Sequence, residues 1–290
     1  MKKFYIIANS AKDTGLKFAK EIAGYIEKKG GKCTVAESKI RTDDERDWCL
    51  DEETDAILKE SECVLVVGGD GTLIQAARAF AGYNLPFLGI NFGTLGFLTE
   101  IERNNVFEAI DTLFKDNYHI EERMMLAGRI IRNGKVVEED IALNDIVFAR
   151  AGTLRVVDFK IYLNGEYFNN YSADGMIVAT PTGSTAYNLS AGGPLVEPGA
   201  DIMLVTPICP HTMLSKSFVL KAQDEVAVNI LAPHEADVEQ IIEVNFDGSN
   251  RVKLMAGDRV VVSKSDKTVT LIRLSQLSFL ETLHRKLREE

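Results

Sequence analysis

Gly68-Gly69-Asp70-Gly71-Thr72 stands between a strand-like run and a helix-like run. The preceding run, Cys63-Val64-Leu65-Val66-Val67, is short, β-branched and continuously apolar, which is typical of a parallel strand buried on both faces. The residues that follow, 72–80, place good helix formers on a helical apolar spacing, and Gly82 ends the pattern. The sequence therefore predicts a strand-to-helix turn, and the rest of the chain is arranged around it.

The composition of this turn favours an anionic ligand. Glycines allow positive φ and leave the backbone open, and the amides at the start of a helix attract anions such as phosphate. Asp70 is unfavourable beside a phosphate unless a metal or a transferable proton lies between them, so it is a candidate general base or metal partner. A tight turn in which Asp70 only binds local amides explains these residues equally well.

The whole chain favours a small-molecule ligand. It has 290 residues, enough for two domains, and a formal net charge of −10, which argues against a nucleic-acid partner or a membrane-surface role. No segment has the length of a membrane span, and the amino-terminal apolar run is too short for a signal peptide. The four cysteines and four histidines are scattered, so we expect reduced thiols in a cytoplasmic protein and no metal site built from them.

The first half alternates predicted strands with predicted helices. Strands are expected at residues 3–9, 33–36, 63–67 and 86–91, and helices at residues 14–29, 72–80 and 105–114. This alternation predicts an open parallel sheet with helices on both faces, whose ligands bind beyond the carboxyl ends of the strands. The loop Asn91-Phe92-Gly93-Thr94-Leu95-Gly96-Phe97-Leu98 lies at that edge too, although its two aromatics, taken singly, are better explained as core residues.

The second half has the pattern of an antiparallel sheet. Strands are expected at residues 126–132, 135–138, 141–149 and 154–163, with hairpin turns at Asn133-Gly134 and Asn164-Gly165. We predict an α/β amino-terminal domain at residues 1–122 and a β-rich carboxyl-terminal domain at 123–268. Residues 269–290 end in a helix at 279–287 that returns to the first domain or packs against a partner subunit.

Polar residues interrupt this β-rich region at two places. Asn144-Asp145 lies within an apolar strand pattern, which indicates either ligand contact or a strand break whose polar groups bond a neighbouring loop. The block from Ala173 to Pro194 is dense in glycine and hydroxyl residues, which suits a nucleotide-contacting loop with Tyr187 free to stack or bond. Asn245-Phe246-Asp247-Gly248-Ser249 predicts another hairpin turn, whose acid can face the site. His211, in a proline-flanked loop, is interpreted as packing or capping and given no chemistry.

Together these motifs resemble the NAD kinase family, which phosphorylates NAD to NADP. The resemblance runs to about residue 250 and rests on the Gly68–Thr72 turn, the 91–98 loop, Leu143-Asn144-Asp145, the 173–194 block and Thr206-Pro207-Ile208-Cys209-Pro210-His211, in that order. Lipid kinases and phosphofructokinases share the first motif, whereas the block at 180–194 is far more specific. The resemblance implies the two-domain fold of NAD kinases and diacylglycerol kinases.

The resemblance also implies roles for individual residues. Asp70 matches the catalytic aspartate, which takes the proton from the adenosine 2′-hydroxyl of NAD as it attacks the γ-phosphorus of ATP. The turn amides would hold the phosphates, with Mg²⁺ bridging the transferred group, and the remaining matched residues would bind nucleotide. The phosphate-binding set is Gly68, Gly69, Gly71 and Thr72; Asn144 and Asp145 bind NAD hydroxyls; Asp174 recognises the nicotinamide end; Phe97 lies near the adenine; Thr182, Thr185, Ala186, Tyr187 and Ser190 surround the nucleotides.

Two departures from the family pattern stand out. Many members have Glu where this chain has Asp145, and many have an Arg-Pro pair where this chain has Ser215-Lys216-Ser217-Phe218. The resemblance further implies a homodimer or homotetramer whose sites include residues of a neighbouring subunit. Two alternative functions stay open, a lipid kinase of the diacylglycerol or sphingosine type and a non-catalytic nucleotide sensor.

Overall fold

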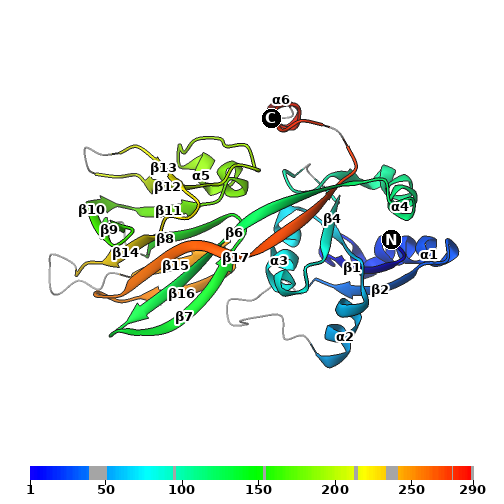
Figure 1. Ribbon diagram of the computed structural model, residues 1–290, viewed down its shortest axis with the longest axis horizontal. Coiled ribbons are helices and arrows are strands. Elements are labelled where there is room, and N and C mark those ends of the chain that lie inside the picture. The colour runs from blue at the N-terminus through cyan, green and yellow to red at the C-terminus, as the bar shows by residue number, and fades with distance from the viewer. Residues whose placement is uncertain are drawn as a thin grey trace. The chain divides into compact units, whose positions relative to one another are not determined.

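The computed structural model describes residues 1–38, 51–93, 96–152, 155–211, 215–232, 241–275 and 277–288 (Figure 1). The chain divides into two compact units, one formed by residues 1–123 and 268–290 and the other by residues 124–267. Thr94 and Leu95, which belong to the predicted second glycine-rich loop, lie outside the described residues.

The first unit is built on a parallel sheet with the strand order β17, β4, β3, β1, β2, and β5 beside β4. Its strands are β1 (Lys3–Ala8), β2 (Lys32–Glu37), β3 (Cys63–Gly68), β4 (Pro86–Asn91), β5 (Ile101–Glu102) and the end of β17 (Arg259–Arg273). Its helices are α1 (Lys17–Lys28), α2 (Glu52–Glu60), α3 (Asp70–Ala79), α4 (Val106–Phe114) and α6 (Phe279–Arg288). The predicted parallel sheet is confirmed.

Alternate side chains of these strands pack against helices on opposite faces. Phe4 and Ile6 of β1 join a core with Ile22 of α1 and Ile110 of α4. Tyr5, between them, points the other way and meets the ring of Phe80, beyond the end of α3, at 5.9 Å. Burial on both faces explains why β3 carries an uninterrupted apolar sequence.

The second unit is an antiparallel sandwich. One of its sheets has the order β13, β12, β11, β8, β15, β16, and the other contains β10, β9, β14 and β17, with β6 beside β17 and β7 beside β6. The first sheet comprises β8 (Asp145–Ala151), β11 (Gly175–Ala179), β12 (Ile202–Ile208), β13 (Phe218–Lys221), β15 (Ile241–Phe246) and β16 (Asn250–Leu254). The second comprises β6 (His119–Arg132), β7 (Lys135–Ala142), β9 (Val157–Leu163), β10 (Glu166–Ala173) and β14 (Val226–Ile230) with β17.

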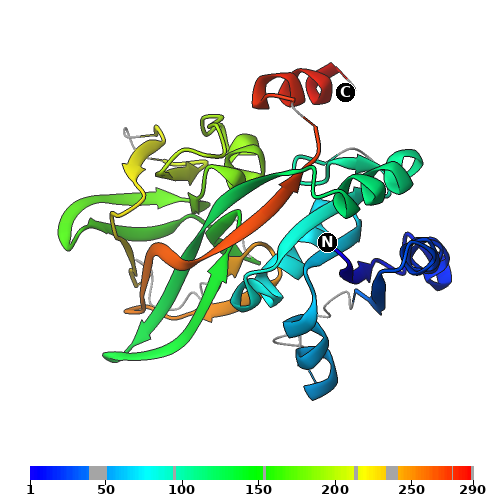
Figure 2. The same ribbon diagram turned by 45° about the vertical axis from the view of Figure 1, so that its right-hand side comes forward.

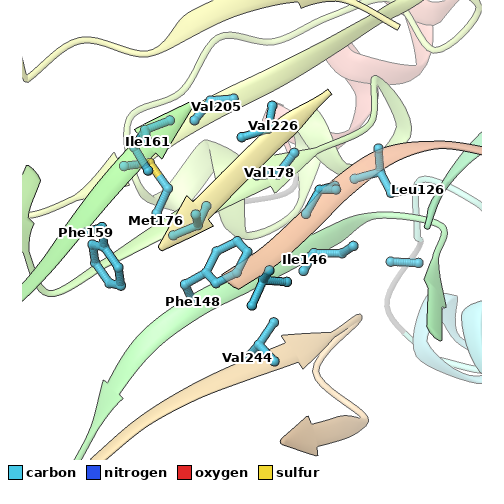
Figure 3. Packing of buried hydrophobic residues seen from close by; sticks show 14 of the residues in the cluster. Leu126, Ile146, Phe148, Phe159, Ile161, Met176, Val178, Val205, Val226 and Val244 are labelled. Atoms are coloured by element: carbon cyan, nitrogen blue, oxygen red, sulfur yellow. The ribbon is translucent and has the colours of Figure 1, made fainter. Parts of the chain in front are cut away.

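Side chains from both sheets fill the interior of the sandwich. Figure 3 shows Phe148 and Met176 from one sheet among Phe159, Ile161 and Val226 from the other. The long strands β6 and β17 pair with each other, and each has one end in each unit (Figure 2). The predicted fold class, an α/β domain plus a β-rich domain, is therefore confirmed.

The hairpin turns form as their sequences predict. Asn133-Gly134 joins β6 to β7, Asn164-Gly165 joins β9 to β10, and Asp247-Gly248 joins β15 to β16. In each turn these two residues have positive φ, between 50° and 83°. The first two turns are two-residue loops, and the third also contains Ser249. Positive φ at both residues requires the Asn-Gly or Asp-Gly pair.

Two predicted elements are wrong in extent. The strand expected at residues 141–149 is interrupted, because β7 ends at Ala142, where it pairs with β6, and β8 begins at Asp145 in the other sheet. The helix expected from residue 14 begins at Lys17, since Gly15 and Leu16 have positive φ. Among the described helices, none is long and apolar enough to cross a membrane.

Candidate active site

Three loops of the first unit meet at the carboxyl edge of its parallel sheet. β1, β3 and β4 are neighbours, so the loops that follow Ala8, Gly68 and Asn91 emerge side by side. The Phe92 N–H donates to the Gly68 carbonyl over 2.8 Å, and the Asn9 side-chain amide donates to Thr72 Oγ1 over 3.3 Å. These bonds fix the Gly68–Thr72 turn between its two neighbours, where an open parallel sheet binds ligands.

Asp70 is held by the backbone of the loop after β4. The N–H groups of Leu98 and Thr99 donate to Oδ1 over 3.1 and 3.0 Å, and that of Phe97 donates to Oδ2 over 2.5 Å. An ionised carboxylate accepts about four hydrogen bonds, so Oδ2 keeps a lone pair for a further donor. The carboxylate is thus pre-oriented, and one of its oxygens is still able to receive a proton.

Two glycines at this edge are required by close packing. A Cβ on Gly96 would lie 1.8 Å from Asp70 Oδ1, and a Cβ on Gly68 would lie 2.5 Å from Thr72 Oγ1. By contrast, a Cβ on Gly71 would meet nothing within 4 Å. The turn is therefore tight beneath Asp70 and open at Gly71, where the first-turn amides of α3 have no acceptor within the helix.

Oxygen donors suitable for a magnesium ion are present but few. The Asn91 side-chain oxygen is buried and has no hydrogen-bond partner among the described residues, and it lies at the end of β4, close to the Asp70 loop. No group of three His, Cys, Asp or Glu side chains in the described part of the chain could hold a metal by itself. This donor set fits Mg²⁺, which is usually held by one or two protein oxygens with substrate phosphates and water.

In the second unit, Asp247 organises the Asn144-Asp145 pair. Its carboxylate accepts from the N–H groups of Leu143, Asn144 and Asp145 over 2.7, 2.8 and 3.1 Å. Leu143 and Asn144 lie between β7 and β8, and Asp145 is the first residue of β8. The acid of a hairpin turn thus satisfies the backbone amides at the predicted strand break, and ligand contact by the Asn144 and Asp145 side chains stays a prediction.

Asp145 is a buried acid beside a second acid. Asp145 is only 5% exposed to solvent. Burial first, and the negative charge of Asp247 second, raise the pKa of the Asp145 carboxyl to about 7. At neutral pH a substantial fraction of Asp145 is protonated, so it can donate as well as accept a hydrogen bond.

The loop after β11 packs directly against the same strand break. Thr180 donates through its hydroxyl to the Leu143 carbonyl over 2.6 Å and through its N–H to the Asn144 carbonyl over 2.9 Å. A Cβ on Gly183 would lie 2.1 Å from that Asn144 oxygen, so only glycine fits there. The structure therefore brings Thr182 into the neighbourhood of Asn144 and Asp145.

Part of the hydroxyl density in this loop is internal. Asn188 is fully buried; its amide nitrogen donates to the Ser184 and Pro194 carbonyls, and its oxygen accepts from the Thr206 hydroxyl. The small polar residues of this block thus build a scaffold as well as a surface. Among the predicted ligand residues, Tyr187 and Ser190 are exposed, Thr185 and Ala186 are half-buried, and Thr182 is buried.

Asp174 lies away from this cluster. It precedes Gly175 of β11, whereas Thr180 follows Ala179, so six extended residue steps, about 20 Å, separate the two positions. The Arg150 guanidinium pairs with Asp174, with Nε 2.7 Å from Oδ1 and Nη2 3.3 Å from Oδ2. This hydrogen-bonded ion pair lowers the pKa of Asp174.

Four residues of this edge or cluster received no clear role from the sequence. Arg150 stands alone between ordinary neighbours and carries no motif signal. The same is true of Lys12, whose Nζ lies 3.1 Å from the position of a Cβ built on Gly69. Asn91 and Gly96 belong to a glycine-rich motif that could have identified them, but the close approach of Gly96 to Asp70 depends on a residue distant in the sequence.

Family models match both halves of the chain. Residues 4–118 match the ATP-NAD kinase N-terminal domain, and residues 143–274 match the ATP-NAD kinase C-terminal domain. The chain belongs to the ATP-NAD kinase family. It is accordingly a phosphotransferase of this family, and the family predicted from the motifs is confirmed.

Full-length relatives and solved structures agree with this assignment. The chain is 42% identical to the NAD kinase of Agathobacter rectalis and 40% identical to that of Lachnoclostridium phytofermentans, in each case over 99% of both chains. Its fold is similar to that of the yeast NADH kinase complexed with NADH, with a TM-score of 0.86 and 20% identity over 99% of this chain and 88% of the other. It is also similar to the NAD kinase from Archaeoglobus fulgidus in complex with ATP, with a TM-score of 0.75 and 22% identity over 99% of both chains.

Proposed function

We propose that this chain transfers the γ-phosphoryl group of ATP to the adenosine 2′-hydroxyl of NAD, giving NADP and ADP. The observation that carries the proposal is the Asp70 carboxylate, which three loop amides hold in the glycine-rich turn. Binding alone gains nothing from an acid beside phosphate, whereas a phosphoryl transfer to a hydroxyl needs a proton acceptor.

The chemistry assigned to Asp70 is general base catalysis. Its Oδ2 lone pair takes the proton of the 2′-hydroxyl as that oxygen forms a bond to the γ-phosphorus. The bond between the γ-phosphorus and its bridging oxygen breaks, and its electrons leave with ADP. The first-turn amides at Gly69, Asp70 and Gly71, with Gly68 and Thr72 shaping the turn, would hold the phosphates.

Mg²⁺ belongs to the proposal as a companion of ATP. The Asn91 side-chain oxygen would hold it with the phosphates and water, and it would reduce the negative charge of the phosphoryl donor.

The second unit would supply the residues that hold the acceptor. Asn144 and Asp145 are proposed to bind NAD hydroxyls. Because the pKa of Asp145 is raised, its carboxyl can either donate a hydrogen bond to a ribose hydroxyl or accept one from it. Thr182, Thr185, Ala186, Tyr187 and Ser190 are proposed to line the nucleotide, and Phe97 to lie near adenine. Asp174 is proposed to recognise the nicotinamide end.

A homodimer or homotetramer in the cytoplasm completes the proposal. Asp174 lies about 20 Å of strand from Thr180, which suits a residue that serves the site of a neighbouring copy. The described cysteines, Cys33, Cys63 and Cys209, are free thiols, as expected for a reducing compartment.

A donor and acceptor panel tests the activity. The chain is incubated with Mg²⁺ and either ATP or polyphosphate, against NAD, NADH or diacylglycerol vesicles, and each product is identified by mass and by the position of its new phosphate. We expect 2′-phosphorylated NAD from ATP and NAD. Lipid-dependent consumption of ATP would indicate a lipid kinase instead, and nucleotide binding without any transfer would indicate a sensor.

A further inference from the structure

The loop after β1 carries a lysine whose ammonium group lies over the glycine-rich turn. A Cβ built on Gly69 would be 3.1 Å from Lys12 Nζ, and one built on Gly93 would be 3.4 Å from it. The ammonium group therefore lies next to two of the three loops at the carboxyl edge of the sheet, close to the open face at Gly71. Glycine at 69 and 93 leaves room for it.

The backbone that carries Lys12 is anchored on both sides. The Asn9 N–H donates to the Val67 carbonyl over 3.0 Å, and the Asn9 carbonyl accepts from the N–H groups of Lys12 and Asp13 over 3.0 and 2.8 Å. The buried Asp13 carboxylate then accepts from the N–H groups of Phe18 and Ala19 over 3.0 and 2.9 Å, which caps α1. The Asn9 bond to Thr72 ties this loop to the turn itself.

The charge of Lys12 is not neutralised by any residue that the structure describes. Among the described residues no carboxylate forms an ion pair with it, although the chain as a whole carries a formal charge of −10. A chain with this net charge needs local cations to attract a nucleoside triphosphate. The Arg103 guanidinium, another cation of the same unit, is stacked on the rings of Phe18 and Phe92, at 4.7 and 4.8 Å from their centroids.

We infer that Lys12 binds the terminal phosphates of the phosphoryl donor over the Gly69–Gly71 turn. The inference rests on the proposed function, which makes ATP the phosphoryl donor. NAD also carries a pyrophosphate, and a lysine could bind that group in the same way. The donor is assigned because the γ-phosphorus must lie within reach of an acceptor hydroxyl bonded to Asp70, and Asp70 and Gly69 are adjacent residues of one turn. The positive charge of Lys12 would also offset the negative charges of the phosphates and of Asp70 at this turn.

The variants Lys12→Met and Lys12→Arg test this role, with Lys28→Met as a matched control. Lys28 is an exposed lysine in the last turn of α1, so its replacement removes the same charge far from the turn's loops. Inorganic tripolyphosphate, ATP and NAD, each with Mg²⁺, are titrated by calorimetry into the full chain and its variants. Steady-state kcat and KM are then measured separately for ATP and NAD.

We expect Lys12→Met to weaken the binding of tripolyphosphate and ATP by about 10- to 100-fold, the usual effect of losing one charged hydrogen bond. NAD affinity and thermal unfolding should stay at the wild-type values, because Lys12 is exposed and its side chain forms no hydrogen bond or ion pair with the described residues. Lys12→Arg should recover most of the affinity, and Lys28→Met should not change it.

The two proposals fail in different ways. Wild-type affinity of Lys12→Met for tripolyphosphate and ATP would overturn the role of Lys12, even if NADP is formed normally. Loss of NAD affinity alone would assign Lys12 to the acceptor and also overturn the inference. If tripolyphosphate binding depends on Lys12 but wild-type protein makes no NADP, the donor site stands and the proposed acceptor is wrong.

Discussion

Gly96 has no side chain because the carboxylate of Asp70 occupies the space where one would be. A Cβ there would lie 1.8 Å from Asp70 Oδ1, and backbone amides of the same loop hold that carboxylate. Gly96→Ala must therefore displace either the loop or Asp70. We predict that kcat of NAD phosphorylation falls at least about 10-fold, since a small misplacement of a catalytic group costs one to two orders of magnitude.

Gly82→Ala is the control for this substitution. A Cβ on Gly82 would meet nothing within 4 Å, and its φ is ordinary, so the change adds the same methyl group without a clash. Equal kcat values for the two alanine variants would show that the position of Asp70 does not depend on Gly96.

Asp145 gives the folded chain a defined dependence on pH. The pKa of its carboxyl is about 7 in the folded chain, above the value of about 4 for an unfolded aspartate. Between these values the folded state binds more protons than the unfolded state, so the free energy of unfolding falls as pH rises from about 4 to about 7. Urea unfolding across this range should show a shallower fall for Asp145→Asn than for the wild-type chain. A parallel pH dependence in both proteins would contradict the raised pKa.

Among single residues, sequence patterns identify those that belong to a motif but not those that stand outside any motif. Asp70 stands out because three glycines surround it. Lys12 and Arg150 have no such signal. Lys12 lies next to glycines at least 57 residues further along the chain, and Arg150 pairs with Asp174, 24 residues away, so only the folded chain reveals these contacts. The contacts of Asp70 with residues 97–99 are likewise set by packing of two loops and not by local sequence.

At the element scale, the hairpin between β15 and β16 serves as more than a turn. Asp247 has a φ of 50° and accepts hydrogen bonds from three amides where β8 begins. Asp247→Asn keeps a residue that tolerates positive φ but offers one acceptor oxygen in place of two. We predict a loss of about 1–3 kcal/mol in the free energy of unfolding and a raised KM for NAD, with KM for ATP unchanged.

Asn133→Asp is the matched control, because Asn133 is also the first residue of a hairpin loop and its φ of 51° is close to the 50° of Asp247. This substitution exchanges the same two side-chain types without the three amides. If both variants are destabilised equally, the effect belongs to turn chemistry and not to the strand break at residues 143–145.

Elements with local signals could be predicted, and the interrupted strand could not. The buried strands, their helices and the Asn-Gly hairpins follow from period, length and turn residues. Residues 141–149 have the apolar, β-branched composition of one strand. The break within them depends on Asp247, about a hundred residues further along, and on two sheets that need separate strands.

At the scale of the whole molecule, the placement of Asp174 gives a test of the proposed oligomer. If Asp174 serves the site of a neighbouring copy, a mixed dimer of Asp70→Asn and Asp174→Ala chains contains one site with both residues intact. Random mixing should then restore about a quarter of the wild-type activity in a two-fold dimer. The measurement is NADP formation by the co-expressed variants, with each variant alone as control. Activity no greater than the sum of the separate variants would place Asp174 outside a shared site.

The order of motifs along the chain was enough to predict the family and the two-domain fold class. Sequence could not decide which polar residues bind ligand and which build the scaffold. Asn188 and Ser184 lie in the same hydroxyl-rich block as Tyr187 and Ser190, yet the first two are buried in mutual hydrogen bonds and the last two are exposed. That division depends on how the loop folds over β11 and β12.

The turnover of Asp70→Asn shows whether the Asp70 carboxylate is the general base of the phosphoryl transfer. The variant is assayed for NADP formation from ATP, Mg²⁺ and NAD at saturating concentrations, after calorimetry has established that it still binds both nucleotides. Our account predicts a kcat lower by about 10²-fold or more, because asparagine cannot take the proton of the 2′-hydroxyl. A kcat close to that of the wild-type chain would contradict the account.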